Sequence, residues 1–163
     1  MIQMKTILHP TDFSESSNYA LGYAIAFAKQ FEAKICLLHV IPDISFQMYS
    51  GMSSIPLPSQ QVPETAVLMA DIEKHVRQSL EEVLPPEVRG SIPVEYFTRN
   101  GVAFLEIIRC ADQIKADVIV LGTHGHTGLK HAIIGCVAEN VVRKSPCPVF
   151  TVRHPEHKFE MPV

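Results

Sequence analysis

The sequence predicts an α/β protein: a three-layer α/β/α fold with a five-stranded parallel sheet, of the Rossmann-like type. Short apolar runs rich in β-branched residues, such as 118–121, have the composition of strands buried on both faces, which is typical of parallel sheets. These runs alternate with longer segments of helical periodicity. Such alternation favours right-handed crossovers between parallel strands, with helices on both faces of the sheet.

The predicted elements cover most of the chain. Strands are expected at 5–10, 33–41, 94–98, 118–121 and 148–152. Helices are expected at 12–31, 64–84, 102–115 and in the segment that contains Val137 and Val141, which share one helical face. The expected buried faces of the first three helices consist of Ala20, Ala24, Phe27 and Phe31; of Leu68, Ile72, His75, Val76 and Leu80; and of Leu105, Ile107, Ile108, Ala111 and Ile114.

Length and composition favour one domain, expected over 1–153, with a long flexible loop over 42–63 and a C-terminal tail over 154–163. The net charge is −3, and no basic stripe or polybasic run is present, which argues against binding to nucleic acid or a membrane surface. The chain has no apolar window of about 18 residues and no signal-like apolar core near its start. We therefore expect a cytoplasmic protein.

The four cysteines, at positions 36, 110, 136 and 147, show no paired spacing. Cys36 and Cys110 lie inside apolar patterns and are expected to be buried free thiols.

A glycine-containing stretch joins the fourth predicted strand to the helix that follows it. Gly122 ends the strand, Gly125 lies in the loop, and Gly135 precedes the helix. Glycines let a backbone approach an anion, and a helix start offers free N–H groups and the positive end of its dipole. The stretch predicts a phosphate site, although the same glycines also suit turns that need a positive φ.

The pattern Gly122-x2-Gly125-x9-Gly135 resembles the phosphate loop of the universal stress protein family, in its ATP-binding branch. The family pattern continues with Ser, Thr or Asn, where this chain has Cys136. Residues 7–12, Ile-Leu-His-Pro-Thr-Asp, resemble the family's first strand and adenine-side loop, and 147–153 resemble its last strand. The resemblance extends over about the whole chain.

The resemblance implies the strand order 3-2-1-4-5, whose order reverses between strands one and four. It also implies ATP as ligand, with Mg²⁺ or Mn²⁺ bound through the phosphates. The implied nucleotide contacts are Pro10, Thr11, Asp12, Val40, Leu121, Gly122, His124, Gly125, Gly135, Cys136 and Val137. Asp12 also has a simpler interpretation, as the N-cap that opens the first helix with Glu15, and the backbone of Val40 is the part that the family uses for the adenine.

Two residue types invite other interpretations of the same edge. The thiol of Cys136 is a weaker hydrogen-bond donor to phosphate than a hydroxyl. A helix start also increases the reactivity of a thiol, so a redox switch is an alternative role for Cys136. His124, His126 and His131 fall in the loop, and His9 and His39 lie near the same edge. No zinc-ligand spacing accompanies them, so we expect them to contact phosphate or face solvent.

The resemblance favours a nucleotide-dependent regulatory or interaction module in the stress response, with an unknown protein partner. A nucleotide-free interaction module of the same fold is the first alternative, because Cys136 breaks the phosphate pattern. A slow ATP hydrolase or phosphotransferase is the second, although no Walker lysine, paired acidic metal site or Ser/His/Asp arrangement supports it.

A homodimer through strand five, Pro148 to Val152, is also expected. The strand lies at the sheet edge in the implied order and is strongly apolar. Self-pairing about a two-fold axis satisfies both edges, although the tail over 154–163 is an alternative cover.

Overall fold

The computed structural model describes residues 3–42, 62–123 and 135–155. The predicted loop over 42–63 and tail over 154–163 lie mostly outside these ranges. Four predicted or discussed residues lie outside them entirely: His124, Gly125, His126 and His131. In chain order the elements are β1 (Thr6–Pro10), α1 (Glu15–Phe31), β2 (Lys34–Pro42), α3 (Val62–Glu82), β3 (Val94–Gly101), α4 (Ala103–Gln113), β4 (Val118–Gly122), α5 (Cys136–Lys144) and β5 (Val149–Val152).

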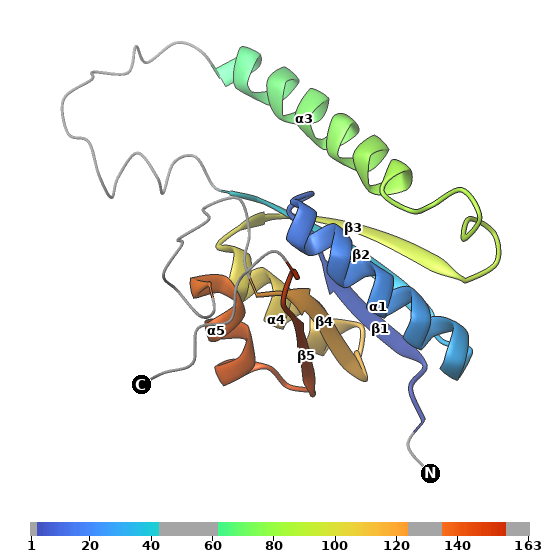
Figure 1. The fold of residues 1–163 in the computed structure, drawn as a ribbon. Coiled ribbons are helices and arrows are strands. Elements are labelled where there is room, and N and C mark those ends of the chain that lie inside the picture. Colours follow the sequence, from blue (N-terminus) through green and yellow to red (C-terminus); the bar gives the residue numbers. More distant parts are fainter. Residues whose placement is uncertain (1–2, 43–61, 124–134, 156–163) are drawn as a thin grey trace.

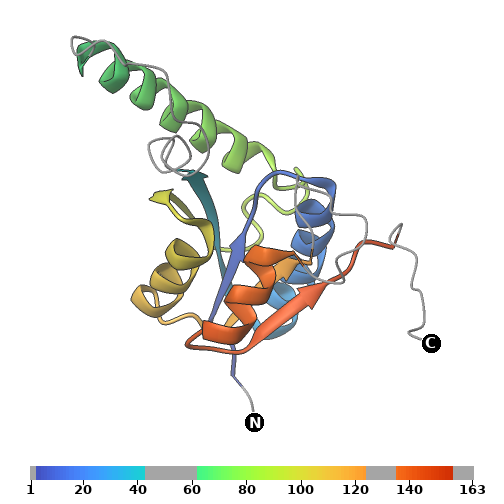
Figure 2. The same ribbon diagram turned by 90° about the vertical axis from the view of Figure 1, so that its left-hand side faces the viewer.

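The described strands form one parallel sheet in the order β3-β2-β1-β4-β5, which confirms the predicted fold class and order. Figures 1 and 2 show α1 and α3 on one side of the sheet and α4 and α5 on the other. Alternate strand residues serve the two faces, as the two-residue period of a strand requires. Ile7 and Val120 pack in the core beneath α1, whereas Leu8 and Ile119 pack in the core beneath α4 and α5.

Most elements differ by a few residues at their ends from the expectations, and three of these differences concern β2, β3 and α3. β3 is longer than predicted, because the Asn-Gly pair at 100–101 stays paired with Ile41 and Pro42 and does not turn away. Pro42 likewise belongs to β2, and α3 begins at Val62, so the connection between them starts later and ends earlier than predicted.

Three residues expected on buried helix faces are exposed. Leu105 lies opposite the buried stripe of α4, which consists of Ile107, Cys110 and Ala111. Val137 is 41% exposed, because α5 turns Ala138 and Val141 to the core. His75 lies beside the inner stripe of α3, and its Nδ1 is 2.7 Å from the carbonyl oxygen of Asp71, one turn earlier.

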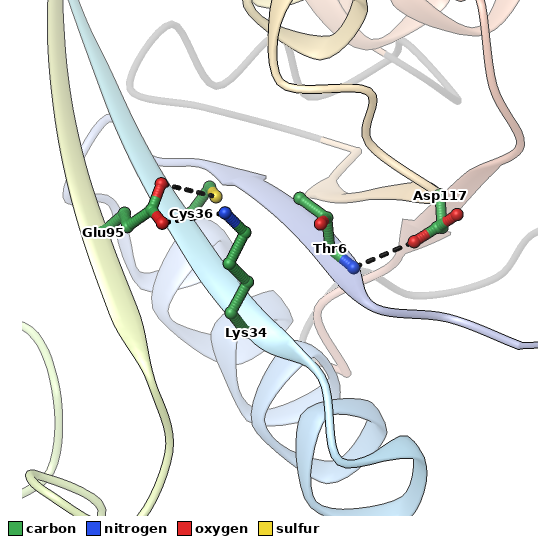
Figure 3. Close-up of polar contacts among 5 residues, drawn as sticks. All are labelled: Thr6, Lys34, Cys36, Glu95 and Asp117. Carbon is green, nitrogen blue, oxygen red and sulfur yellow. Dashed lines mark hydrogen bonds and ion pairs between the residues drawn. The ribbon is translucent and has the colours of Figure 1, made fainter.

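Polar contacts tie the strands together at the edge where they begin (Figure 3). One carboxylate oxygen of Asp117 accepts the backbone N–H groups of Lys5 and Thr6, at 2.7 and 2.9 Å. Lys34 forms an ion pair of 2.8 Å with Glu95, whose other oxygen lies 3.9 Å from the thiol of Cys36 (Figure 3). These contacts have a structural role, because the edge lies opposite the carboxyl ends where ligands of such sheets bind.

The expectation for the two apolar cysteines is confirmed. Cys36 and Cys110 are buried free thiols in the core beneath α4. Burial is the largest cause that raises the pKa of Cys36 to about 12, and burial also raises the pKa of Cys110. Both thiols are therefore protonated at neutral pH and have little reactivity.

Candidate functional site

The carboxyl ends of β1 and β4 mark the point where the strand order reverses. These strands are neighbours, but the chain leaves β1 for α1 on one face and leaves β4 for α5 on the other. Their pairing covers Ile7 with Val118 and Leu8 with Ile119 among the described residues, although both strands continue beyond these positions. Ligands of open α/β sheets bind in the crevice at such a point.

The turn from β1 into α1 is held by its own side chains. The backbone N–H of Thr11 donates to the carbonyl oxygen of Leu38, which keeps the end of β1 on β2. The hydroxyl of Thr11 accepts the N–H of Phe13 at 3.0 Å and lies 3.0 Å from the hydroxyl of Ser17. Phe13 has a φ of 63°, an unusual value for a side chain of this size, and this network keeps it there.

Ser14, and not Asp12, is the N-cap of α1. The Ser14 hydroxyl accepts the backbone N–H of Ser17 at 3.2 Å. Asp12 lies two residues earlier and its carboxylate accepts the N–H of Ser14 at 3.0 Å, which is an Asx turn. The capping-box prediction for Asp12 and Glu15 was therefore wrong, because Thr11 to Phe13 extend the turn by two residues before the helix begins.

Gly122, the last residue of β4, has a packing role. A Cβ at this position would lie 2.7 Å from the hydroxyl oxygen of Ser16 and 3.0 Å from its carbonyl oxygen. Its φ is not positive, so the turn interpretation is wrong for this glycine. The first turn of α1 approaches β4 so closely that only glycine fits, and this contact brings the two connections at the crevice together.

Gly135 is the N-cap of α5. Its backbone N–H donates to the carbonyl oxygen of Thr123 at 2.6 Å, so the start of α5 lies next to the end of β4. Its φ of −72° is accessible to any residue, and as a glycine it supplies no side-chain cap. The N–H groups of the first turn of α5, which begins at Cys136, have no partner within that turn, and such groups bind anions well.

The remaining predicted residues are distributed over these strand ends. Pro10 and Leu121 are buried in the ends of β1 and β4. Val40 lies within β2, paired with Arg99, and not at its end. Cys136 and Val137 are exposed at the start of α5. The structure thus places Pro10 to Asp12 and Gly135 to Val137 at neighbouring strand ends, while His124 and Gly125 lie outside the described residues.

His9 is the residue of this region whose role the sequence did not predict. Its side chain is fully buried, and its Nδ1 lies 2.8 Å from the carbonyl oxygen of Val120 on β4. Burial, the largest cause, lowers the pKa of His9 to about 4, although the hydrogen bond to Val120 and the charge of Asp12 raise it. His9 therefore neither faces solvent nor is charged at neutral pH. A polar residue near the end of an apolar strand was the available signal.

His39 also has a structural environment. Its Nδ1 lies 2.8 Å from the carbonyl oxygen of Thr11, and its ring stacks on that of Phe13, with centroids 4.7 Å apart.

In the part of the chain that the structure describes, no three His, Cys, Asp or Glu side chains are grouped to hold a metal ion. None of the helices described there has both the length and the apolar character to cross a membrane.

The fold defines the class: a doubly wound α/β protein, in which ligands commonly bind at the switch point of the sheet. Residues 4–153 match the model of the universal stress protein family, and the chain belongs to that family. It is 32% identical to universal stress protein MJ0531 of Methanocaldococcus jannaschii over 152 residues, which cover 93% of this chain and 84% of that protein.

The solved structures give the same assignment. The structure of MJ0577 from the same archaeon superimposes with a TM-score of 0.75 at 28% identity, covering 94% of this chain and 98% of that one. Two more distant structures share the fold and contain nucleotides. One is a universal stress protein in complex with cAMP, at 22% identity and a TM-score of 0.58 over 93% of this chain and 98% of that one. The other, from Archaeoglobus fulgidus, is in complex with dAMP, at 18% identity and a TM-score of 0.52, with the same coverage of both chains.

Proposed function

We propose that this chain is a cytoplasmic ATP-binding protein whose nucleotide state regulates its association with other proteins during stress. The observation that carries the proposal is the start of α5. This helix begins at Gly135, which has no side chain to cap it and is bonded to Thr123 at the carboxyl end of β4, beside β1. The cAMP and dAMP complexes of the related proteins support a nucleotide as the class of ligand.

In the proposed complex the phosphates lie at the N-terminus of α5. The first-turn N–H groups at Cys136 and Val137 donate to phosphate oxygens, and Gly125 and Gly135 let the backbone approach them. Asp12 and the backbone of Val40 contact the nucleoside. Mg²⁺ or Mn²⁺ accompanies the phosphates, whose oxygens are the ligands that these cations prefer.

Direct binding measurements test this proposal. Calorimetry with Mg-ATP is expected to give one site per chain, and mass spectrometry of the mildly purified protein is expected to find carried-over nucleotide. No heat and no thermal shift at millimolar Mg-ATP would refute it. The nucleotide-free interaction module would then be the better account, with the thiol of Cys136 in place of the family's usual hydroxyl as its supporting observation.

We also propose a homodimer through β5. This strand ends the sheet, and Phe150, which is 38% exposed, contacts the ring of Phe27 with centroids 5.0 Å apart. Aromatic surface beside a strand edge that no described strand pairs with favours pairing with a second copy about a two-fold axis.

Thr151→Lys is a cleaner test of the dimer than a change at Val149, because Thr151 is exposed whereas Val149 packs on the core beneath α5. Light scattering of the wild type is expected to give the mass of two chains, and the variant that of one folded chain. A dimer in the variant would place the interface elsewhere, and a wild-type monomer would refute the proposal.

A further inference from the structure

The side chain of His9 connects the ends of β1 and β4 at the point where the two strands separate. Beyond Leu8 and Ile119 the two strands have no further paired positions among the described residues. The end of β1 stays on β2, through Pro10 paired with Leu38, while the end of β4 stays on β5, through Gly122 paired with Val152. At this point the sheet consists of two halves that separate.

The side chain of His9 spans this separation. Its Nδ1 is 2.8 Å from the carbonyl oxygen of Val120, in a fully buried hydrogen bond. A carbonyl oxygen only accepts, so the proton is on Nδ1 and Nε2 is the bare nitrogen. The imidazole thereby supplies the donor that a backbone N–H of β1 would supply if the pairing continued.

The second nitrogen of His9 shows that the ring is held for this one bond. Nε2 has no hydrogen-bond partner among the described residues, although it is buried. The hydroxyl of Ser16, which packs against Gly122 on the same face of the sheet, is also buried without a partner there. A buried acceptor without a donor, such as Nε2, lowers the stability of the folded protein. The hydrogen bond from Nδ1 to Val120 offsets this cost, which an apolar residue at position 9 would not have.

We infer that His9 is a positioning residue for the nucleotide crevice: by holding the Val120 carbonyl, it fixes the distance between the Pro10–Asp12 and Leu121–Gly122 edges. This inference rests on the proposed nucleotide site for its effect on affinity. Its structural part, the position of the end of β4 relative to β1, is independent of any ligand.

Two variants at His9 separate the hydrogen bond from the volume of the ring. His9→Asn keeps an N–H donor at the position of Nδ1, because both nitrogens are attached to Cγ. His9→Leu fills the site without a donor. Ile7→Val is the matched control, because it removes one buried methyl group from the same face of β1, away from the crevice. All three variants are expected to fold with reduced stability.

Calorimetry with Mg-ATP is expected to show about tenfold weaker binding for His9→Leu, since a lost positioning contact of about 1.4 kcal/mol corresponds to a factor of ten. His9→Asn is expected to retain affinity within about threefold, and Ile7→Val to bind as the wild type does. Equal affinities of His9→Leu and the wild type would overturn the role in binding. So would equal losses in His9→Leu and Ile7→Val, because the effect would then follow stability and not the bond.

Nuclear magnetic resonance without nucleotide tests the structural part separately. In the wild type, the ¹⁵N shifts of His9 are expected to show the Nδ1–H tautomer at pH 7. The amide signals of Leu121, Gly122 and Thr123 are expected to shift in His9→Leu and much less in His9→Asn. Unmoved amides in His9→Leu would overturn the inference. A wild type that binds no nucleotide would instead refute the proposed function, while these amide signals still decide whether His9 positions β4.

Discussion

Two connections meet at the crevice, and they satisfy their helix ends in opposite ways. The turn from β1 into α1 uses the side chains of Thr11, Asp12 and Ser14 to accept backbone N–H groups. In the connection from β4 into α5 the N-cap Gly135 has no side chain, and the described contacts are backbone bonds, such as that from the N–H of Gly135 to the Thr123 carbonyl. The first helix start is capped by its own side chains, and the second begins at a glycine, where we propose that the ligand binds.

The comparison supports the start of α5 as the proposed anion site. The first N–H groups of a helix need acceptors from side chains, water or a ligand, and those of α1 have an acceptor from Ser14. An uncapped start is not sufficient by itself, since α4 also begins without a side-chain cap, at Val102. The start of α5 differs because it follows β4, one of the two strands at the switch point.

The largest effect is expected at His9, which bridges the two connections. The pKa of His9 is about 4 in the folded protein and ordinarily 6.5, so between these values the unfolded chain binds a proton that the folded protein does not. The contribution of His9 to the free energy of unfolding is therefore complete above pH 6.5 and is lost as the pH falls toward 4. The loss approaches about 3 kcal/mol, because one pKa unit corresponds to about 1.4 kcal/mol. Urea unfolding at pH 7 and pH 4.5 measures it. His9→Leu should lose less stability over this range, and an equal loss in both proteins would contradict the assignment.

Gly122→Ala sharpens the comparison by forcing the two connections apart. The added Cβ would lie 3.0 Å from the carbonyl oxygen of Ser16, and overpacking of this kind costs about 2 kcal/mol. Gly22→Ala is the control: this exposed glycine lies within α1 with nothing near an added Cβ, so a gain of about 0.5–1 kcal/mol is expected. Chemical denaturation of both variants gives the difference in their free energies of unfolding. Equal effects would show that α1 moves away from β4 at this contact without a cost in stability.

The sequence predicted the fold and strand order because buried parallel strands leave continuous apolar runs, and because residues 7–12 and 122–135 match a family pattern. It predicted the wrong cap for α1, because Asp12 and Ser14 are both good caps and only the conformation of Phe13 decides between them. The reason for Gly122 was also not predictable, because its neighbour Ser16 is distant in sequence. His9 was placed at the right edge but given the wrong environment, since a side-chain bond to a backbone carbonyl leaves no sequence pattern.

Ser14→Ala tests the claim that α1 is completed by its own chain. Loss of this cap is expected to cost about 1 kcal/mol of stability, the usual cost for a serine cap. Because the proposed phosphate site is at α5 and not at α1, the affinity for Mg-ATP should stay within about twofold. Denaturation and calorimetry measure the two quantities, and a large loss of affinity with little loss of stability would reverse the roles of the two helices.

Cys136→Ser is the converse change at the start of α5. A hydroxyl is a better donor than a thiol, so Mg-ATP binding is expected to tighten by about 0.5–1.5 kcal/mol. The side chain is exposed, so stability should hardly change. An unchanged or weaker affinity would mean that residue 136 does not face the phosphates.

The most direct test of the central claim is a titration of ¹⁵N-labelled protein with Mg-ATP, followed through the backbone amides of both helix starts. The account predicts large, saturable shifts at Gly135, Cys136 and Val137, and small shifts at Ser16 and Ser17 in the first turn of α1. Saturable shifts at Ser16 and Ser17 with none at 135–137, or no shifts at either helix, would contradict it.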